Sequence, residues 1–396
     1  MVRTKNPFGF LSTRIKPIPA GMYHYISPPN DPRNYRLHLR VEDDGNGILI
    51  INASTMLHLN QTATEYAYYI VNNLPIDEVV KKMLSRYKVT PNQVQEDYQN
   101  LIDRIQTLIN TPDLDPVTFL DFNRIEPFQS HISAPFRLDC ALTYRLPESI
   151  GATYAPIERV KNELTSQEWE TIIDAAWQAG IPHIVFTGGE PTLRDDLAQL
   201  ISFAQSKDQV TGLLTNGLRF IDNDYLREIL AAGLDHIMVI FNRETDSAWT
   251  ALQNLCNQDI FTAVHLSIGD ENQSQLSSIL NKISVTGVKA VSLSCITPNN
   301  KDILFKGQTL VAELNLDLIW NLPVPFSEFN PIALETQNQE FLNGAGRAWL
   351  YVEPDGDVLP SQGINTVLGN FLSDPWDVIW KKATSINLGT YTHRLA

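Results

Sequence analysis

Residues 184–191 read IVFTGGEP, a short apolar run that ends in a Gly-Gly turn followed by a glutamate and a proline. An apolar run of this length, bounded by turn residues, predicts a strand buried on both faces. A helix is predicted just before it over residues 166–179, because Thr165-x-x-Glu168 forms a capping box and Gly180 supplies the stop. A helix followed by a buried strand is the unit of a parallel sheet.

The same unit recurs along the chain from Arg137 onward, with helical patterns between apolar strands. This alternation predicts an α/β fold with parallel strands. Residues 317–322 are a candidate further strand. In a barrel of such strands the site lies at their carboxyl ends, where residues 188–191 fall. The six predicted strands are Leu138–Thr143, His183–Thr187, Val210–Thr215, His236–Phe241, Phe261–Ser267 and Ala290–Cys295.

The loop after the first strand, residues 143–156, reads TYRLPESIGATYAP. Together with the Gly-Gly-Glu-Pro of residues 188–191, it resembles the cluster-binding loop of radical SAM enzymes in everything except its cysteines. The family's loop carries Cys-x3-Cys-x2-Cys followed by an aromatic residue. With Tyr154 as that aromatic residue, the three cysteine positions fall at Leu146, Ile150 and Thr153.

The resemblance implies a partial (β/α)6 TIM-like barrel of radical SAM type over residues 136–325. It also implies a vestigial pocket for S-adenosylmethionine (SAM). Glu190 on its own is more often a capping or solvated carboxylate than a general base, so we expect no catalytic residue. The residues that the resemblance assigns to the vestigial pocket are Tyr154, Gly188, Gly189, Glu190 and Pro191.

The substitutions in the loop remove the donors that an iron–sulfur cluster needs, because its iron is held by anionic thiolates. Leu146 and Ile150 offer hydrocarbon, and Thr153 offers a neutral hydroxyl. We therefore expect no iron–sulfur cluster, no metal ligand and weak SAM binding or none. The chain has three cysteines, and no two lie close enough in sequence for a metal-ligand spacing; they are Cys140, Cys256 and Cys295.

The first part of the chain shows a different pattern. Residues 1–20 read as an extended arm, and residues 21–112 as a small α+β domain of winged-helix type, followed by a linker over 113–135. The predicted strands are Tyr23–Ser27, Tyr35–Val41 and Gly47–Asn52, and the predicted helices are Asn60–Asn72, Ile76–Tyr87 and Pro91–Ile109.

Within this domain, residues 50–66 read IINASTMLHLNQTATEY and resemble the start of a PqqD-like domain, the peptide-recognition element of ribosomal peptide modification systems. The resemblance implies that a leader peptide adds as a strand at the sheet edge near residues 48–52, or at its neighbour, and packs on the last helix. A domain retained for packing alone is the alternative. The expected peptide-binding residues are Ile48, Ile50, Val94, Tyr98 and Leu101.

Residues 348–363 read AWLYVEPDGDVLPSQG and resemble the hairpin of the SPASM/twitch extension, here expected over residues 326–396. Enzymes with that extension commonly hold an auxiliary iron–sulfur cluster, with a cysteine where this chain has Ser361. The Pro-Asp-Gly-Asp segment at 354–357 predicts a turn whether or not a metal binds.

Composition limits the partners. Thirty lysines and arginines against forty-five acidic residues give a net charge of −15, which repels nucleic acid. The sequence has no apolar run long enough to cross a membrane, so a cytoplasmic protein is expected.

These observations favour a non-catalytic, radical SAM-like protein that binds a precursor or leader peptide, or an intact radical SAM enzyme, in ribosomal peptide modification. Two alternatives stay open. One is an enzyme that uses the SAM pocket for a non-radical reaction, and the other is a structural subunit of an assembly.

Overall fold

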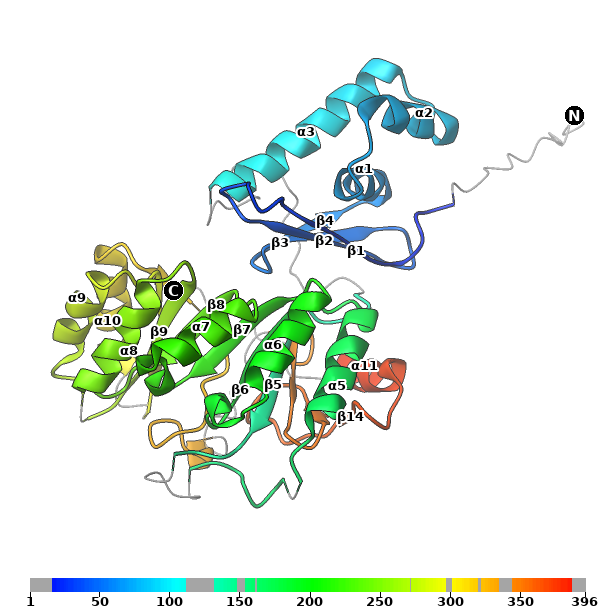
Figure 1. The fold of residues 1–396 in the computed structure, drawn as a ribbon. Coiled ribbons are helices and arrows are strands. Elements are labelled where there is room, and N and C mark those ends of the chain that lie inside the picture. Colours follow the sequence, from blue (N-terminus) through cyan, green and yellow to red (C-terminus); the bar gives the residue numbers. More distant parts are fainter. Residues whose placement is uncertain are drawn as a thin grey trace, which may run out of the picture. The chain divides into compact units, whose positions relative to one another are not determined.

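A computed structural model describes residues 16–111, 132–147, 154–160, 162–270, 272–296, 301–319, 322–334 and 344–386. The chain divides into two compact units, residues 1–125 and 126–396, and each is described by itself (Figure 1). The expected sites at Ile150 and Thr153 lie outside the described residues.

The first unit is an antiparallel sheet of four strands in the order β1-β2-β3-β4, covered on one face by three helices. Sequence predicted three of these strands. The fourth was missed because the chain reverses through Asn52 and Ala53, whose φ angles are 50° and 57°. The elements are β1 (Gly21–Ile26), β2 (Arg36–Val41), β3 (Gly47–Ile51), β4 (Thr55–Leu59), α1 (Gln61–Val71), α2 (Ile76–Arg86) and α3 (Pro91–Asn110).

The core of the first unit lies between this sheet and the helices. The helix α3 begins after Thr90, whose side chain caps the backbone N–H of Gln93, and Pro91 occupies the first helical position, as predicted. Its apolar stripe is buried, and alternate residues of the strands meet it from the sheet. The buried residues of α3 are Val94, Tyr98, Leu101, Ile105, Leu108 and Ile109.

The second unit contains a ten-stranded sheet in the order β11-β10-β9-β8-β7-β6-β5-β12-β13-β14. From β5 to β11 the strands are parallel and follow chain order, as the alternating pattern predicted. These strands are β5 (Arg137–Thr143), β6 (His183–Gly188), β7 (Val210–Thr215), β8 (His236–Ile240), β9 (Phe261–Ile268), β10 (Ala290–Cys295) and β11 (Asp317–Leu318).

Helices alternate with these strands and pack on the sheet (Figure 1). The first of them has the predicted capping box, with Thr165 and Glu168 bonded reciprocally and Gly180 in the left-handed conformation. The inner face opposite the helices carries one apolar residue from each of five strands: Val185, Leu214, Met238, Ala263 and Ala290. The helices are α5 (Ser166–Ala179), α6 (Leu197–Ser206), α7 (Asn223–Ala231), α8 (Asp246–Cys256), α9 (Leu276–Ser284) and α10 (Lys301–Glu313).

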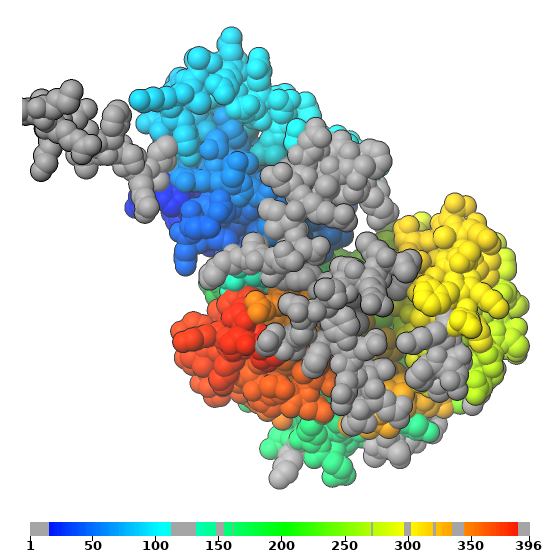
Figure 2. Space-filling model, turned by 180° about the vertical axis from the view of Figure 1, so that it is seen from behind, coloured from blue at the N-terminus to red at the C-terminus, as the bar shows by residue number. Residues whose placement is uncertain are grey.

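The C-terminal elements extend the same sheet. β12 (Trp349–Val352) runs parallel to β5, and β13 (Asp357–Leu359) and β14 (Gly369–Asn370) follow antiparallel. The sequence predicted the hairpin but not its pairing with β5. The helix α11 (Trp376–Ser385) closes this end, and Figure 2 shows these C-terminal residues on one flank of the unit with α9 and α10 on the opposite flank.

Among the residues that the structure describes, no helix is both long and apolar enough to cross a membrane.

Candidate functional site

The Gly-Gly turn at the end of β6 is set by a close approach of two backbones. A Cβ on Gly188, where φ is 130°, would overlap the carbonyl oxygen of Thr143, and a Cβ on Gly189 would overlap that of Arg145. The N–H of Gly189 donates to Thr143 O at 2.8 Å, and the N–H of Glu190 donates to Arg145 O at 2.9 Å. Only glycine fits at both positions, so the motif has a structural reason of its own.

Glu190 is buried and accepts four hydrogen bonds from its own chain. Its Oε1 accepts from the Thr192 N–H at 3.1 Å and from the hydroxyls of Thr192 and Thr215, each at 2.6 Å. Its Oε2 accepts from the Asn216 N–H at 2.8 Å. Burial raises the pKa of Glu190, and these donors oppose the rise. The carboxylate therefore joins the ends of β6 and β7.

The loop after β5 does not offer the donors of an iron–sulfur cluster. Leu146, at the first expected cysteine position, packs on an apolar cluster that includes Tyr144 and Phe326. The backbone oxygen of Tyr154 accepts from the N–H of Ile332 at 2.9 Å. No group of three histidine, cysteine or acidic side chains able to hold a metal occurs in the described part of the chain. A thiolate-held cluster does not fit these residues.

The cysteines do not supply a site elsewhere. Cys140 is buried in β5, where burial raises its pKa well above the usual value, so it is no ready thiolate. Cys256 ends α8 and Cys295 ends β10. Ser361 stands where enzymes with a SPASM/twitch extension have a cysteine for an auxiliary cluster. Its hydroxyl accepts a hydrogen bond from Trp349 Nε1 at 3.3 Å. The C-terminal hairpin is thus held by hydrogen bonds.

A buried ionic contact that the sequence did not signal joins the loop after β5 to the hairpin after β12. The Tyr144 hydroxyl donates to Glu353 Oε1 at 2.8 Å, and Arg159 Nη2 lies 2.6 Å from the same oxygen. Burial raises the pKa of Glu353, and the Arg159 guanidinium opposes that rise. The contact fixes the loop through residues more than 200 positions apart in sequence.

His265 on β9 takes part in buried polar contacts with three serines. His265 on β9 lies 3.0 Å from Ser292 Oγ through Nδ1, and its Nε2 lies 3.2 Å from Ser267 Oγ and 3.1 Å from Ser294 Oγ. Burial lowers the pKa of His265 to about 3, which keeps the imidazole neutral. The alternation of His265 with Ser267, and of Ser292 with Ser294, was the available sequence signal.

At the opposite, amino end of the strands, His183 and His236 meet with their Nε2 atoms 2.8 Å apart. Gly212 on the strand between them leaves room, because a Cβ there would overlap the His236 ring. Burial lowers the pKa of His236 to about 4. This pair lies away from the carboxyl ends of the strands and forms part of the packing.

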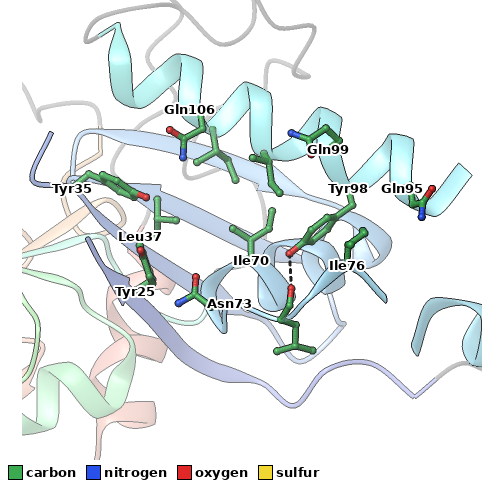
Figure 3. Close-up of a pocket in the computed structure, with 13 residues that line it drawn as sticks. Tyr25, Tyr35, Leu37, Ile70, Asn73, Ile76, Gln95, Tyr98, Gln99 and Gln106 are labelled. Carbon is green, nitrogen blue, oxygen red and sulfur yellow. Dashed lines mark hydrogen bonds between the residues drawn. The ribbon is translucent and has the colours of Figure 1, made fainter. Parts of the chain in front are cut away.

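The first unit contains a cavity of about 630 Å³ between α3 and the β1–β2 side of its sheet (Figure 3). Tyr98 points from α3 toward the end of α1, and its hydroxyl donates to Leu74 O at 3.4 Å. None of the lining residues is charged. They are Tyr25, Tyr35, Leu37, Ile70, Asn73, Leu74, Ile76, Gln95, Tyr98, Gln99, Ile102, Ile105 and Gln106.

The predicted peptide-binding residues divide between this cavity and other places. Tyr98 lines the cavity, whereas Val94 and Leu101 are buried in the core beside it. Ile48 and Ile50 alternate with the core-facing residues of β3 and so point to the other face of the sheet. β3 itself is not an open edge, because β2 and β4 pair with it on both sides. Its neighbour β4, the alternative place, is an outer strand within the described residues.

Comparisons with known proteins agree with the architecture of the second unit. Residues 140–256 match the model of the radical SAM superfamily. A PqqA peptide cyclase of Granulibacter bethesdensis is 35% identical over 114 residues, 28% of this chain and 30% of that protein. One of Gluconobacter oxydans is 34% identical over 117 residues, 29% of this chain and 32% of that protein. The matches thus span about a third of these curated relatives.

The fold is similar to that of SuiB from Streptococcus suis. Its structure with S-adenosylmethionine is 15% identical, covers 90% of this chain and 88% of SuiB, and has a TM-score of 0.56. Its structure with the precursor peptide SuiA gives the same coverage and TM-score at 16% identity. At this identity the likeness shows the fold, which is of radical SAM type.

These findings correct the expectation of a non-catalytic binding protein. The curated relatives are named for a catalytic activity on a peptide, and residues 140–256 are similar to the radical SAM superfamily.

Proposed function

We propose that this chain is a peptide-modifying protein and that its substrate is a ribosomally made precursor peptide. The relatives named PqqA peptide cyclase and the fold of peptide-bound SuiB support this substrate class. In this chain itself, the main support for the proposal is the uncharged cavity between α3 and the β1–β2 side of the sheet.

The edge of the sheet beside this cavity suits an extended peptide. β1 pairs with β2 on one side and has no strand partner on the other side within the described residues. A peptide laid along β1 gains main-chain hydrogen bonds, and every second side chain can enter the cavity. We therefore propose that the peptide pairs with β1 and not with the edge near β3.

The lining predicts which side chains the cavity takes. Tyr25, Tyr35 and Tyr98 present aromatic rings, and Gln95 and Gln99 present neutral amides. A charged side chain would lose hydration there without gaining an opposite charge, so aliphatic and aromatic side chains are favoured. One apolar side chain of the lining, Ile76, stays partly in solvent at 36% exposure.

The finer assignments of the domains belong to the same proposal. Residues 21–112 act as a PqqD-like recognition domain, residues 136–325 as the radical SAM-type domain, and residues 326–396 as a SPASM/twitch-like extension. The chain holds no iron–sulfur cluster with its own loop, because the position of Leu146 supplies hydrocarbon. Gly188 to Pro191 and Tyr154 remain candidate contacts for SAM.

The proposal is tested with the full chain and overlapping fluorescein-labelled peptides that cover each short open reading frame beside the gene. Fluorescence anisotropy measures the dissociation constants. Gln95→Glu places a charge at an exposed position of the lining at nearly constant size. A bound apolar side chain would cover this charge, so binding should weaken about three- to tenfold, which corresponds to ~1 kcal/mol.

The matched control is Asn100→Asp, which adds the same charge at an exposed position of α3 that does not line the cavity. It should leave the dissociation constant unchanged. If no peptide binds, or if both substitutions weaken binding equally, the cavity is not the peptide site.

A further inference from the structure

We propose that the cluster His265, Ser267, Ser292, Ser294 and Asn242, here called the imidazole–hydroxyl cluster, is a binding site for an uncharged main-chain amide of a peptide. The inference rests on the proposed peptide substrate and adds a second contact, in the second unit. The sequence places Asn242 and Ser267 at the carboxyl ends of the strands but gives the cluster no ligand.

The cluster is built by the register of neighbouring strands. Ser292 pairs with His265 and Ser294 pairs with Ser267 between β10 and β9. Ala263 and Ala290, two positions earlier on the same strands, belong to the apolar layer of the inner face. The polar side chains therefore lie on that same face, one layer closer to the carboxyl ends of the strands, where barrel enzymes bind substrates.

One hydrogen-bond donor of this cluster, the Asn242 amide nitrogen, has no partner within the described residues. The Asn242 Oδ1 accepts from the Ser267 N–H at 2.7 Å, which fixes the orientation of the amide. Its Nδ2 atom is then buried, and it has no hydrogen-bond partner within the described residues. Buried donors of this kind are rare unless a ligand or water completes them.

The cluster is electrically neutral. Its hydroxyls and amide carry no charge, and the His265 imidazole is neutral at ordinary pH. Arg243, next to Asn242 in sequence, is engaged with Glu328 at 2.7 Å. A phosphate, carboxylate or ammonium group would find no opposite charge among the five side chains, so the site favours a neutral ligand.

A main-chain amide is complementary to the donor and acceptor groups of this cluster. Its carbonyl oxygen can accept from Asn242 Nδ2, and its N–H can donate to a serine hydroxyl. Ser292 and Ser294 are only partly buried, so these hydroxyls are the accessible side of the cluster. His265 is almost fully buried, at 1% exposure, and its ring nitrogens hold the Ser292 and Ser294 hydroxyls in place. His265 is thus a positioning residue in this site.

The test uses the full chain with ¹³C-labelled histidine and four probes: N-acetyl-dialanine amide, unblocked dialanine, adenosine and SAM. The His265 ring resonance is assigned by His265→Gln. If that variant does not fold, Ser292→Ala provides the assignment because it alters only the partner of His265 Nδ1. The capped dipeptide should shift this resonance in a saturable manner, and unblocked dialanine should not.

Ser294→Ala should raise the dissociation constant of the capped dipeptide about fivefold, which is the effect of losing one neutral hydrogen bond. Ser277→Ala, at an exposed position of α9, is the control and should have no effect. A shift caused by adenosine or SAM alone, or no shift with any probe, overturns the inference.

The shift should persist in Gln95→Glu. If the precursor peptide binds in a manner that depends on Gln95, but no probe shifts the His265 resonance, then only this inference is rejected. Absence of precursor binding with an intact dipeptide shift rejects the proposed function.

Discussion

Individual side chains in this protein take roles that their identity alone does not reveal. Glu190 belongs to a motif that the resemblance links to SAM, yet its carboxylate accepts four hydrogen bonds that join two strand ends. His265 lies in an otherwise apolar stretch of β9, yet its ring contacts three serine hydroxyls. The sequence displayed both residues. Their partners depend on which strands are neighbours, which only the folded sheet determines.

The buried histidines predict a specific pH dependence of stability. Burial lowers the pKa of His236 to about 4 and that of His265 to about 3, from 6.5 in the unfolded chain. As the pH falls below 6.5, the unfolded state binds protons that the folded state cannot take. The free energy of unfolding should therefore be highest above pH 6.5 and fall toward pH 4, by about 1.4 kcal/mol per pH unit for each histidine.

Urea unfolding followed by tryptophan emission checks this, because all seven tryptophans lie in the second unit. His265→Gln should make the dependence on pH shallower between pH 6.5 and 4. His24→Gln, at an exposed position of β1, should not. An unchanged slope in His265→Gln would show that this histidine is protonated in the folded protein.

Secondary-structure elements were predictable where their signals are local. The helix α5 has a capping box and a C-terminal glycine, and its strand β6 is a continuous apolar run. The strand β4 was missed because Ala53 adopts a positive φ that alanine rarely signals. The pairing of β12 with β5 was missed because it joins Trp349 to Arg137, far apart in sequence. Local patterns carry no information about such a register.

The loop after β5 gives a prediction about cofactor content. Anaerobic reconstitution with iron and sulfide should leave the chain without a stoichiometric cluster, because Leu146 and Ile150 cannot bind iron. Iron analysis and visible absorption measure the outcome. The triple substitution Leu146→Cys, Ile150→Cys and Thr153→Cys restores three thiols and is the positive comparison. About four irons per unmodified chain, the content of a [4Fe–4S] cluster, would contradict the prediction.

Across the whole molecule, we propose peptide recognition by the first unit, while the second unit has a radical SAM-type fold. The sequence predicted this division into an α+β part and an α/β part. It placed the peptide at the edge near residues 48–52 or its neighbour and did not identify β1, because the outer strands and the cavity depend on the order β1-β2-β3-β4 and on the position of α3 over β1 and β2.

Hydrogen–deuterium exchange of the full chain, with and without a precursor peptide found by the anisotropy screen, tests the central claim most directly. The sheet has two outer strands in the described residues, β1 at 21–26 and β4 at 55–59, and only β1 lies beside the cavity. If the peptide pairs with β1, amides at 21–26 become protected while those at 55–59 do not change. Protection at 55–59 instead, or none in either strand, would contradict the account.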